Sequence, residues 1–232
     1  MRTGIKTFLS KRASRMSYGL HQATNRWFDE WTLYRLHHRE VAKAPHFCRS
    51  LPAKLNLGCG SNRKDGWVNV DLFDAHADLQ LDLREIWPFP DNSVSYIYSE
   101  HVFEHFEFHI EMPHFLREAY RVLEPAGAFD VVVPDTEPAL KAYGNPSSNY
   151  WPSLAKRWHP DWCETELDHI NFHFRQDGEH KFAWDAETLG RTLKAAGFTN
   201  VLRREFNPLM DTEERRIGSL YMKGIKPDNG PL

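Results

Sequence analysis

The chain has 232 residues, of which 41% are hydrophobic and 26% are charged, and its formal net charge at pH 7 is -3. This length suits one domain with an appended arm, and the composition is that of a soluble globular protein. So small a net charge gives no general attraction to nucleic acid, and no apolar run is long enough to span a membrane. The three cysteines form no C-x-x-C pair, so we expect free thiols and a reducing, cytoplasmic compartment.

Residues 1–50 are predicted to form a basic and aromatic helical arm. Up to Phe28 this arm carries basic residues and no acid, with apolar residues at roughly helical spacing, namely Ile5, Phe8, Leu9 and Met16. Such a segment can make a weak peripheral contact with an anionic membrane, act as a transit peptide, or remain a solvated helical arm. The aromatic residues that follow it recur on one helical face, which we expect to pack on the main domain: Trp27, Trp31, Tyr34 and His38.

Residues 51–232 are predicted to form one α/β domain, in which short apolar runs alternate with amphipathic segments. The predicted strands are "KLNLGCG", "WVNVDL", "VSYIYS", "AFDVVVP", "NVLRRE" and "SLYMKGI". One predicted helix lies in "MPHFLREAYRVLEPAG", with Leu123 on its apolar face, and is stopped by Pro125 and Gly127; the other runs from the N-cap Asp185 to Gly197. This order indicates a Rossmann-like, doubly wound and mostly parallel sheet with an antiparallel edge strand.

The segment from about 136 to 180 interrupts this alternation and is dense in aromatic residues, prolines and histidines. We expect an irregular insertion over these residues. Its aromatic side chains have two alternative roles, which are stacking on a sugar or aromatic ring and forming a small satellite core.

A glycine turn follows the first predicted strand, in "LNLGCGSN". Gly58 and Gly60 lack side chains where a ligand can approach the backbone at the carboxyl end of the sheet. Asp71 ends the next strand and is placed to accept hydrogen bonds from a ribose diol. It follows Gly60 by far fewer residues than the roughly 20 that separate these positions in dinucleotide folds. The spacing leaves no room for a long pyrophosphate-binding helix, which favours S-adenosylmethionine over NAD.

Five segments resemble, in order, the class I S-adenosylmethionine-dependent methyltransferases, especially a compact bacterial subset associated with surface-polysaccharide synthesis. These segments are "LNLGCG", "GWVNVD", "FPDNSVSYIYSEHVFEH", "LREAYRVLEPAGAFDVVVPD" and "HKFAWDAETLGRTLKAAGF". The resemblance spans about Lys54 to Phe206. It implies methyl transfer from S-adenosylmethionine to a small-molecule or glycan-like acceptor, with oxygen as the expected acceptor atom. A non-catalytic cofactor-binding or scaffold protein is the alternative.

The resemblance also implies a set of cofactor-binding residues. Those near the methionine part would be Gly58, Cys59 and Gly60, and Asp71 with Leu72 would lie at the ribose. Asp82 and the backbone of Leu83 would contact the adenine. Ser99 and His101, at the end of a predicted strand, would border the methionine end and the methyl group.

The pentapeptide His101 to His105 has the form H-x-x-E-H, which some zinc peptidases use for two ligands and a base. A zinc hydrolase using His101, Glu104 and His105 is therefore a further alternative. The pentapeptide directly follows a predicted strand, however, and Pro113 comes soon after it, so a long helix cannot carry both imidazoles to one ion. A third zinc ligand could come from Cys163, His169 or His173, but chance spacings are expected in a chain with 13 histidines. We expect no metal, and a histidine as the base that deprotonates the acceptor, in the order His180, His105, His101.

Overall fold

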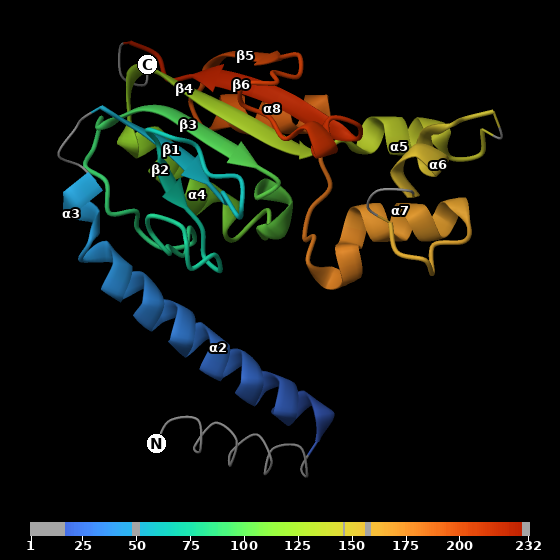
Figure 1. The fold of residues 1–232 in the computed structure, drawn as a ribbon, viewed down its shortest axis with the longest axis horizontal. Helices are drawn as coiled ribbons and strands as arrows, with labels where there is room; N and C mark the ends of the chain where they lie inside the picture. Colours follow the sequence, from blue (N-terminus) through green and yellow to red (C-terminus); the bar gives the residue numbers. More distant parts are fainter. Residues whose placement is uncertain (1–16, 48–51, 146, 156–158, 229–232) are drawn as a thin grey trace.

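The computed structural model covers residues 1–232 and describes 17–47, 52–145, 147–155 and 159–228. The predicted helical spacing before residue 17, and Cys48, lie outside the described residues. Six strands form one sheet in the order β2-β1-β3-β4-β6-β5 (Figure 1). Their bounds are β1 Ala53–Leu57, β2 Val68–Val70, β3 Val94–Glu100, β4 Leu123–Pro134, β5 Thr199–Arg203 and β6 Ser219–Ile225.

The sheet is mostly parallel, as the sequence predicts. Strands β2, β1, β3 and β4 pair in parallel, while β6 is antiparallel to both of its neighbours, β4 and β5. The antiparallel edge of the sheet therefore consists of β6 and the outermost strand β5. Apolar residues alternate with polar ones along β1 and β2, and Leu55, Ile97 and Val131 are fully buried.

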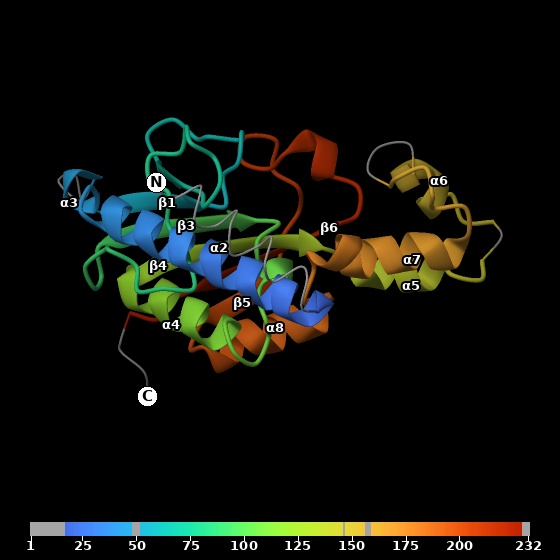
Figure 2. The same ribbon diagram turned by 90° about the horizontal axis from the view of Figure 1, so that it is seen from below.

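Two amphipathic helices cover one face of the sheet, α4 (Met112–Val122) and α8 (Ala186–Ala195) (Figure 2). The carboxylate of Asp185 accepts a hydrogen bond from the Thr188 amide at 2.8 Å, which confirms the predicted N-cap. Helix α4 ends at Val122, before Pro125, and the chain passes directly into β4. A smaller apolar cluster on the sheet consists of Tyr98, Val132 and Tyr221, packed with Trp67, Phe206 and Met210.

The insertion between β4 and α8 is helical, so the prediction of an irregular segment was wrong. It contains α5 (Thr136–Ala142), α6 (Tyr150–Ala155) and α7 (Glu166–Arg175), and it projects beyond the end of β4 (Figure 1). Pro138 and Pro152 stand in the first turns of α5 and α6, where a missing amide hydrogen costs nothing. Thr165 and Asp168 form a capping box that starts α7. We call these three helices the α5–α7 lobe.

Helix α2 (Tyr18–Val41), with the short α3 (Ala44–Phe47), runs from the sheet outwards (Figure 1). Its aromatic face does not pack on the domain, contrary to the prediction, and Trp27 and Trp31 are 61% and 51% exposed. The residues that pack inwards are instead His37, Glu40 and Ala44. Successive aromatic rings stack on one another along the helix, with 6.3 Å between the centroids of Trp27 and Trp31. Among the described residues, no helix combines the length and apolar character needed to cross a bilayer.

Candidate functional site

The glycine turn lies where β1 ends, and it forms the floor of a cavity of about 210 Å³. Gly58 and Gly60 have positive φ angles of 65° and 46°, a conformation that favours glycine. A Cβ on Gly58 would lie 2.1 Å from Cγ2 of Val102, whereas a Cβ on Gly60 would meet no atom within 4 Å. The structure thus brings together Gly58, Cys59 and Gly60 as predicted, and the open side of Gly60 leaves room for a ligand. We call this space the cofactor cavity.

Asp71 lies directly after β2 and holds the glycine turn in place. Its Oδ2 accepts the amide hydrogen of Gly60 at 2.9 Å, and its Oδ1 accepts those of Phe73 and Asp74, each at 2.8 Å. A carboxylate oxygen can accept about two hydrogen bonds, so Oδ2 keeps one acceptor position for a hydroxyl. Asp71 is therefore compatible with a ribose contact, although its first role is to orient the turn.

Two charged residues that the sequence analysis missed complete the cofactor cavity, Glu100 and Arg215. Glu100 is the last residue of β3, and its carboxylate accepts hydrogen bonds from the Thr212 amide at 3.2 Å and hydroxyl at 2.6 Å. The position of Glu100 at a strand end was a usable signal. Arg215 lies in the η3 turn (Glu213–Arg215), more than a hundred residues away, and no local pattern marks it.

The donor set of this cavity fits the methionine end of S-adenosylmethionine. That end carries an ammonium group and a carboxylate, and Glu100 and Arg215 offer the opposite charges beside the backbone of the glycine turn. Burial, with Asp71 nearby, raises the pKa of the Cys59 thiol to about 12. Cys59 therefore remains a neutral thiol in the cavity wall.

Six predicted cofactor residues do not line the cofactor cavity, namely Asp71, Leu72, Asp82, Leu83, Ser99 and His101. Asp82 is buried and is bound by the guanidinium of Arg84, whose Nη2 lies 2.7 Å from Oδ2. Leu83 belongs to the apolar core, and its carbonyl accepts the indole N–H of Trp87 at 3.2 Å. Ser99 is fully buried, and its Oγ has no hydrogen-bond partner among the described residues. Leu72 is partly buried next to Asp71.

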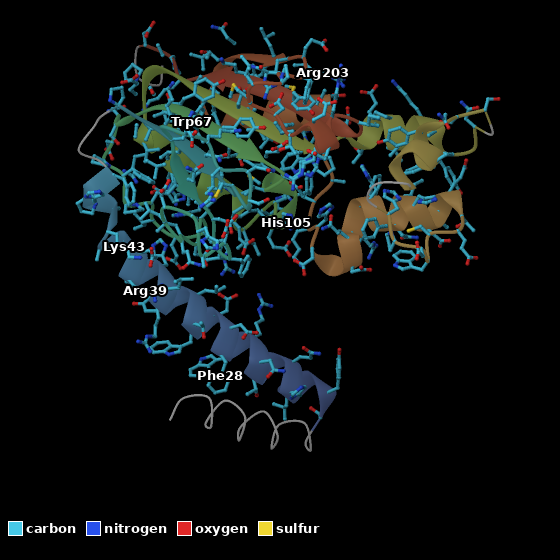
Figure 3. The ribbon with its side chains drawn as sticks, viewed as in Figure 1. Phe28, Arg39, Lys43, Trp67, His105 and Arg203 are labelled. Atoms are coloured by element: carbon cyan, nitrogen blue, oxygen red, sulfur yellow. The ribbon has the colours of Figure 1, made fainter. Side chains whose placement is uncertain are left out.

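A second cavity, of about 240 Å³, lies between the carboxyl ends of β3 and β4 and the α5–α7 lobe. We call it the histidine cavity, because its lining includes His101, His105, His159, His173 and His180. Figure 3 shows His105 at the side of the domain that faces α7. Arg215 lines this cavity as well as the cofactor cavity, so the two spaces share one wall.

His101 lines the histidine cavity and not the cofactor cavity, so its contact with the methionine end of the cofactor stays a prediction. It directly follows β3 and has a positive φ of 56°, which is unusual for a residue with a side chain. Its Nε2 lies 2.9 Å from the hydroxyl of Ser219, and its Nδ1 lies 3.4 Å from a carboxylate oxygen of Glu104. The left-handed backbone turns this side chain away from the glycine turn.

His105 and His180 are close to each other, with 5.1 Å between their ring centroids. Nδ1 of His105 lies 3.1 Å from the carbonyl oxygen of Glu179, and Nδ1 of His180 lies 3.1 Å from that of His173. Since a carbonyl only accepts, each Nδ1 donates its proton, and each Nε2 keeps a lone pair.

Burial lowers the pKa of His180 to about 4, and it lowers the pKa values of His105 and His101 as well. All three predicted bases are therefore neutral near pH 7 and can accept a proton. Glu104 is 1% exposed, and burial raises the pKa of its carboxyl to about 8.

The pentapeptide is not a helical zinc motif. Only Phe103–His105 is helical, as a single 3-10 turn, and the chain is extended again at Phe106. The amides of Lys181 and Phe182 donate to the carbonyl of Glu104 at 2.6 and 3.3 Å, which holds this turn against the segment that carries His180. The expected short helix after a strand is confirmed, and His101 and His105 do not form the pair that a peptidase needs.

A family described as "Methyltransferase domain" (Methyltransf_11) matches residues 55–131, which run from β1 into β4 and include the glycine turn. No curated protein sequence matches the chain. Among solved structures, a SAM-dependent methyltransferase from Archaeoglobus fulgidus is similar at 16% identity and a TM-score of 0.48, with 85% of this chain and 94% of that chain covered. Phosphoethanolamine N-methyltransferase 2 from Haemonchus contortus is similar at 13% identity and a TM-score of 0.47, with 82% and 52% covered. At these values we draw no conclusion from the two structures.

The sheet has the order of the class I methyltransferase fold, and the methyltransferase-domain match covers residues 55–131, about a third of the chain. The domain is an S-adenosylmethionine-dependent methyltransferase, and S-adenosylmethionine is its cofactor. When bound, this cofactor supplies a methyl group carried on a sulfonium. The acceptor takes the methyl group by in-line displacement, and the sulfur leaves as a thioether.

Proposed function

We propose that the protein methylates a hydroxyl oxygen of a small-molecule or glycan-like acceptor held in the histidine cavity. The observation that carries this proposal is the shared wall at Arg215, which lines both cavities. An acceptor in the histidine cavity would lie next to the methionine end of the cofactor, which is the arrangement that a methyl displacement requires. Pro134 and Phe172 supply apolar surface to the same cavity and limit the access of water.

Neutral histidines in this cavity support oxygen as the acceptor atom. A hydroxyl must lose its proton as the methyl group arrives, and an unprotonated imidazole can accept it. The burial that keeps these imidazoles unprotonated also makes them weaker bases than a free histidine. His180 remains our first candidate base, followed by His105 and His101. His180 and His105 are favoured because the Nδ1 of each is held by a carbonyl, which leaves Nε2 for the acceptor.

The aromatic residues of the α5–α7 lobe are an argument for an acceptor with a flat apolar face, such as a sugar ring. Of the aromatic residues in the insertion, Trp151 is buried in a satellite core with Tyr150 and Phe174 packed against it, whereas Phe172 faces the histidine cavity. The satellite core accounts for Trp151, and Phe172 remains our candidate for stacking on an acceptor ring. A sugar acceptor would agree with the resemblance to methyltransferases of surface-polysaccharide synthesis, acting in the cytoplasm.

The exposed aromatic face of α2 supports a weak peripheral membrane contact by the N-terminal arm. Trp27 and Trp31 are more than half exposed, and amphipathic aromatic rings favour the membrane interface. The six basic residues before Phe28 would add attraction to anionic lipid. Sedimentation with phosphatidylserine vesicles at low salt, absent with phosphatidylcholine and abolished by Trp27→Ala with Trp31→Ala, would support this contact.

The test of the function combines binding and turnover. Calorimetry should show micromolar S-adenosylmethionine binding that is lost in Asp71→Ala and kept in Asp65→Ala, since Asp65 is exposed near the same turn. Incubation with methyl-labelled cofactor and a panel of nucleotide sugars and glycans, followed by mass spectrometry and NMR, would then locate the methyl group. Methylation at nitrogen or carbon only would contradict the proposal. Tight cofactor binding without turnover of any acceptor would favour the non-catalytic alternative.

A further inference from the structure

The carboxylate of Glu104 needs an explanation that the methyltransferase fold does not provide. It is 1% exposed at the wall of the histidine cavity, and neither oxygen has a hydrogen-bond partner among the described residues. Its nearest potential ion-pair partner is Nδ1 of His101, at 3.4 Å from Oε1. A buried polar side chain without a hydrogen-bond partner is uncommon, and an ion site is one of the ordinary reasons for such a group.

His105 and His180 stand beside this carboxylate as ready-made nitrogen ligands. One ligand atom from each of Glu104, His105 and His180 lies within 4.8 Å of the others. The Nδ1 protons of both imidazoles are held by the backbone carbonyls of Glu179 and His173. Metal-bound histidines usually have this second hydrogen bond, which fixes the tautomer and the orientation of the ring.

We propose that Glu104, His105 and His180 bind a divalent transition-metal ion, with Zn²⁺ as the first candidate. Two imidazole nitrogens and one carboxylate oxygen form a set that zinc and ferrous iron accept, whereas Mg²⁺ prefers oxygen ligands only. Ligand bonds to zinc are about 2.0–2.2 Å, so the ligand atoms of a tetrahedral site lie about 3.4 Å from one another. The ligand atoms of the three side chains lie within 4.8 Å of one another, so binding would draw them together by up to about 1.4 Å.

This site differs from the zinc-peptidase pattern in the pentapeptide. His101 is not part of the group, because its left-handed backbone directs Nε2 to Ser219, and the second imidazole comes instead from the segment after α7. The carbonyl of Glu104 accepts the amides of Lys181 and Phe182, so the backbone already joins the two ligand segments. Three protein ligands leave a coordination position that faces the histidine cavity.

The role of the ion rests on the proposed function. In the histidine cavity, an ion with an open position would bind the acceptor through an oxygen atom and hold it next to the shared wall at Arg215. His105 and His180 would then act as metal ligands that place the acceptor, rather than as proton acceptors. The site itself requires only the three side chains.

Another group of potential ligands among the described residues, His159, Cys163 and His169, lies in the α5–α7 lobe. It is weaker, because Nδ1 of His159 and Nδ1 of His169 lie 2.7 Å apart and share a hydrogen bond. It provides a control within the same chain: substitution of Cys163 should leave binding at the proposed site unchanged.

The test is a titration of the full chain, without an affinity tag and treated with a chelator, by Zn²⁺ and by Co²⁺. We expect one tight Zn²⁺ site, visible bands of low-coordinate Co²⁺, and no competition from millimolar Mg²⁺. His105→Ala and Glu104→Gln should each weaken Zn²⁺ binding by at least about 10-fold. Cys163→Ser and His109→Ala, an exposed histidine outside the cavity, should keep it.

Two outcomes would overturn the site: Zn²⁺ binding retained in both His105→Ala and Glu104→Gln, or lost in Cys163→Ser. His105 is exposed, so its variant should fold even if burial makes Glu104→Gln unstable, and thermal unfolding would verify this. The titration needs neither cofactor nor acceptor, so it separates the two proposals. Full methyl transfer in the presence of a chelator would overturn the role of the ion and leave the proposed function intact. Zn²⁺ binding without turnover of any acceptor would support the metal site and count against the proposed function.

Discussion

The cofactor cavity and the histidine cavity share Arg215 but are built in different ways. The cofactor cavity takes most of its wall from one continuous segment, residues 56–62, at the end of β1. The histidine cavity takes its wall from the end of β3, the end of β4, α7 and its following turn, and the segment before β6. A binding site formed by one turn is visible in a sequence, whereas a site assembled from four distant segments becomes visible only in the fold.

The largest expected effect is on kcat, and it comes from a residue that lines the histidine cavity alone. His180→Ala should lower kcat by roughly 10²–10⁴-fold, the range for loss of a group that handles the acceptor proton or oxygen. Because His180 does not line the cofactor cavity, the Kd for S-adenosylmethionine measured by calorimetry should remain unchanged. A parallel loss of cofactor affinity would show that the two cavities are one site.

The next effect belongs to the cofactor cavity. Gly58→Ala should destabilise the fold by about 1–3 kcal/mol, since its Cβ would overlap Val102, and should weaken cofactor binding by displacing the turn. Gly60→Ala is the matched control for stability, because it has the same left-handed backbone but open space around the new Cβ. Urea denaturation should show Gly58→Ala to be the less stable variant, and equal stability of the two would contradict the close approach of Val102.

Arg215→Ala should affect both cavities. Loss of a charged hydrogen-bond donor costs about 1.5–3 kcal/mol, so the Kd for the cofactor should rise by roughly 10–100-fold. The KM for the acceptor should rise too, since Arg215 lines its cavity, and Arg215→Lys should restore part of each. Steady-state kinetics with each substrate varied in turn would measure the two effects, and a change in only one of them would assign Arg215 to a single cavity.

The smallest effect concerns the acceptor alone. Phe172→Ala should raise the acceptor KM by roughly 2–10-fold, as expected for about 0.5–1.5 kcal/mol of ring contact, without changing cofactor affinity. Trp162→Ala is a suitable control because Trp162 lies in the same insertion, is 48% exposed and does not line the histidine cavity. Equal effects of the two variants would indicate that the lobe acts through its packing and not through the face of Phe172.

The sequence predicted the parts of this molecule that depend on local patterns. Apolar runs specified the strands, the N-cap Asp185 started α8, and the spacing between Gly60 and Asp71 indicated the cofactor class. The sequence analysis was wrong where one residue type occurs in two kinds of local structure. Prolines at 138 and 152 suggested irregular structure, yet in a first helical turn they are harmless.

The remaining errors are tertiary in origin. The stacked aromatic side chains of α2 have the periodicity of a buried face, but the contacts with the domain come from His37 and Glu40 instead. The direction of the His101 side chain depends on a left-handed backbone, which the residue type does not predict. Arg215 reaches the site from a 3-10 turn near the end of the chain, and only the completed sheet brings it to Glu100.

The ion pairs of Arg84 connect α2 to the segment predicted to contact adenine. Its guanidinium binds Asp82 at 2.7 Å and Glu30 of α2 at 2.9 Å, so one side chain belongs to both the arm and the domain. An adenine that draws on Asp82 would compete with this guanidinium and weaken its hold on the helix. By thermodynamic reciprocity, any surface that captures α2 would alter cofactor affinity to the same extent. The orientation of the arm and the occupancy of the methyl-donor site would then be coupled through Arg84.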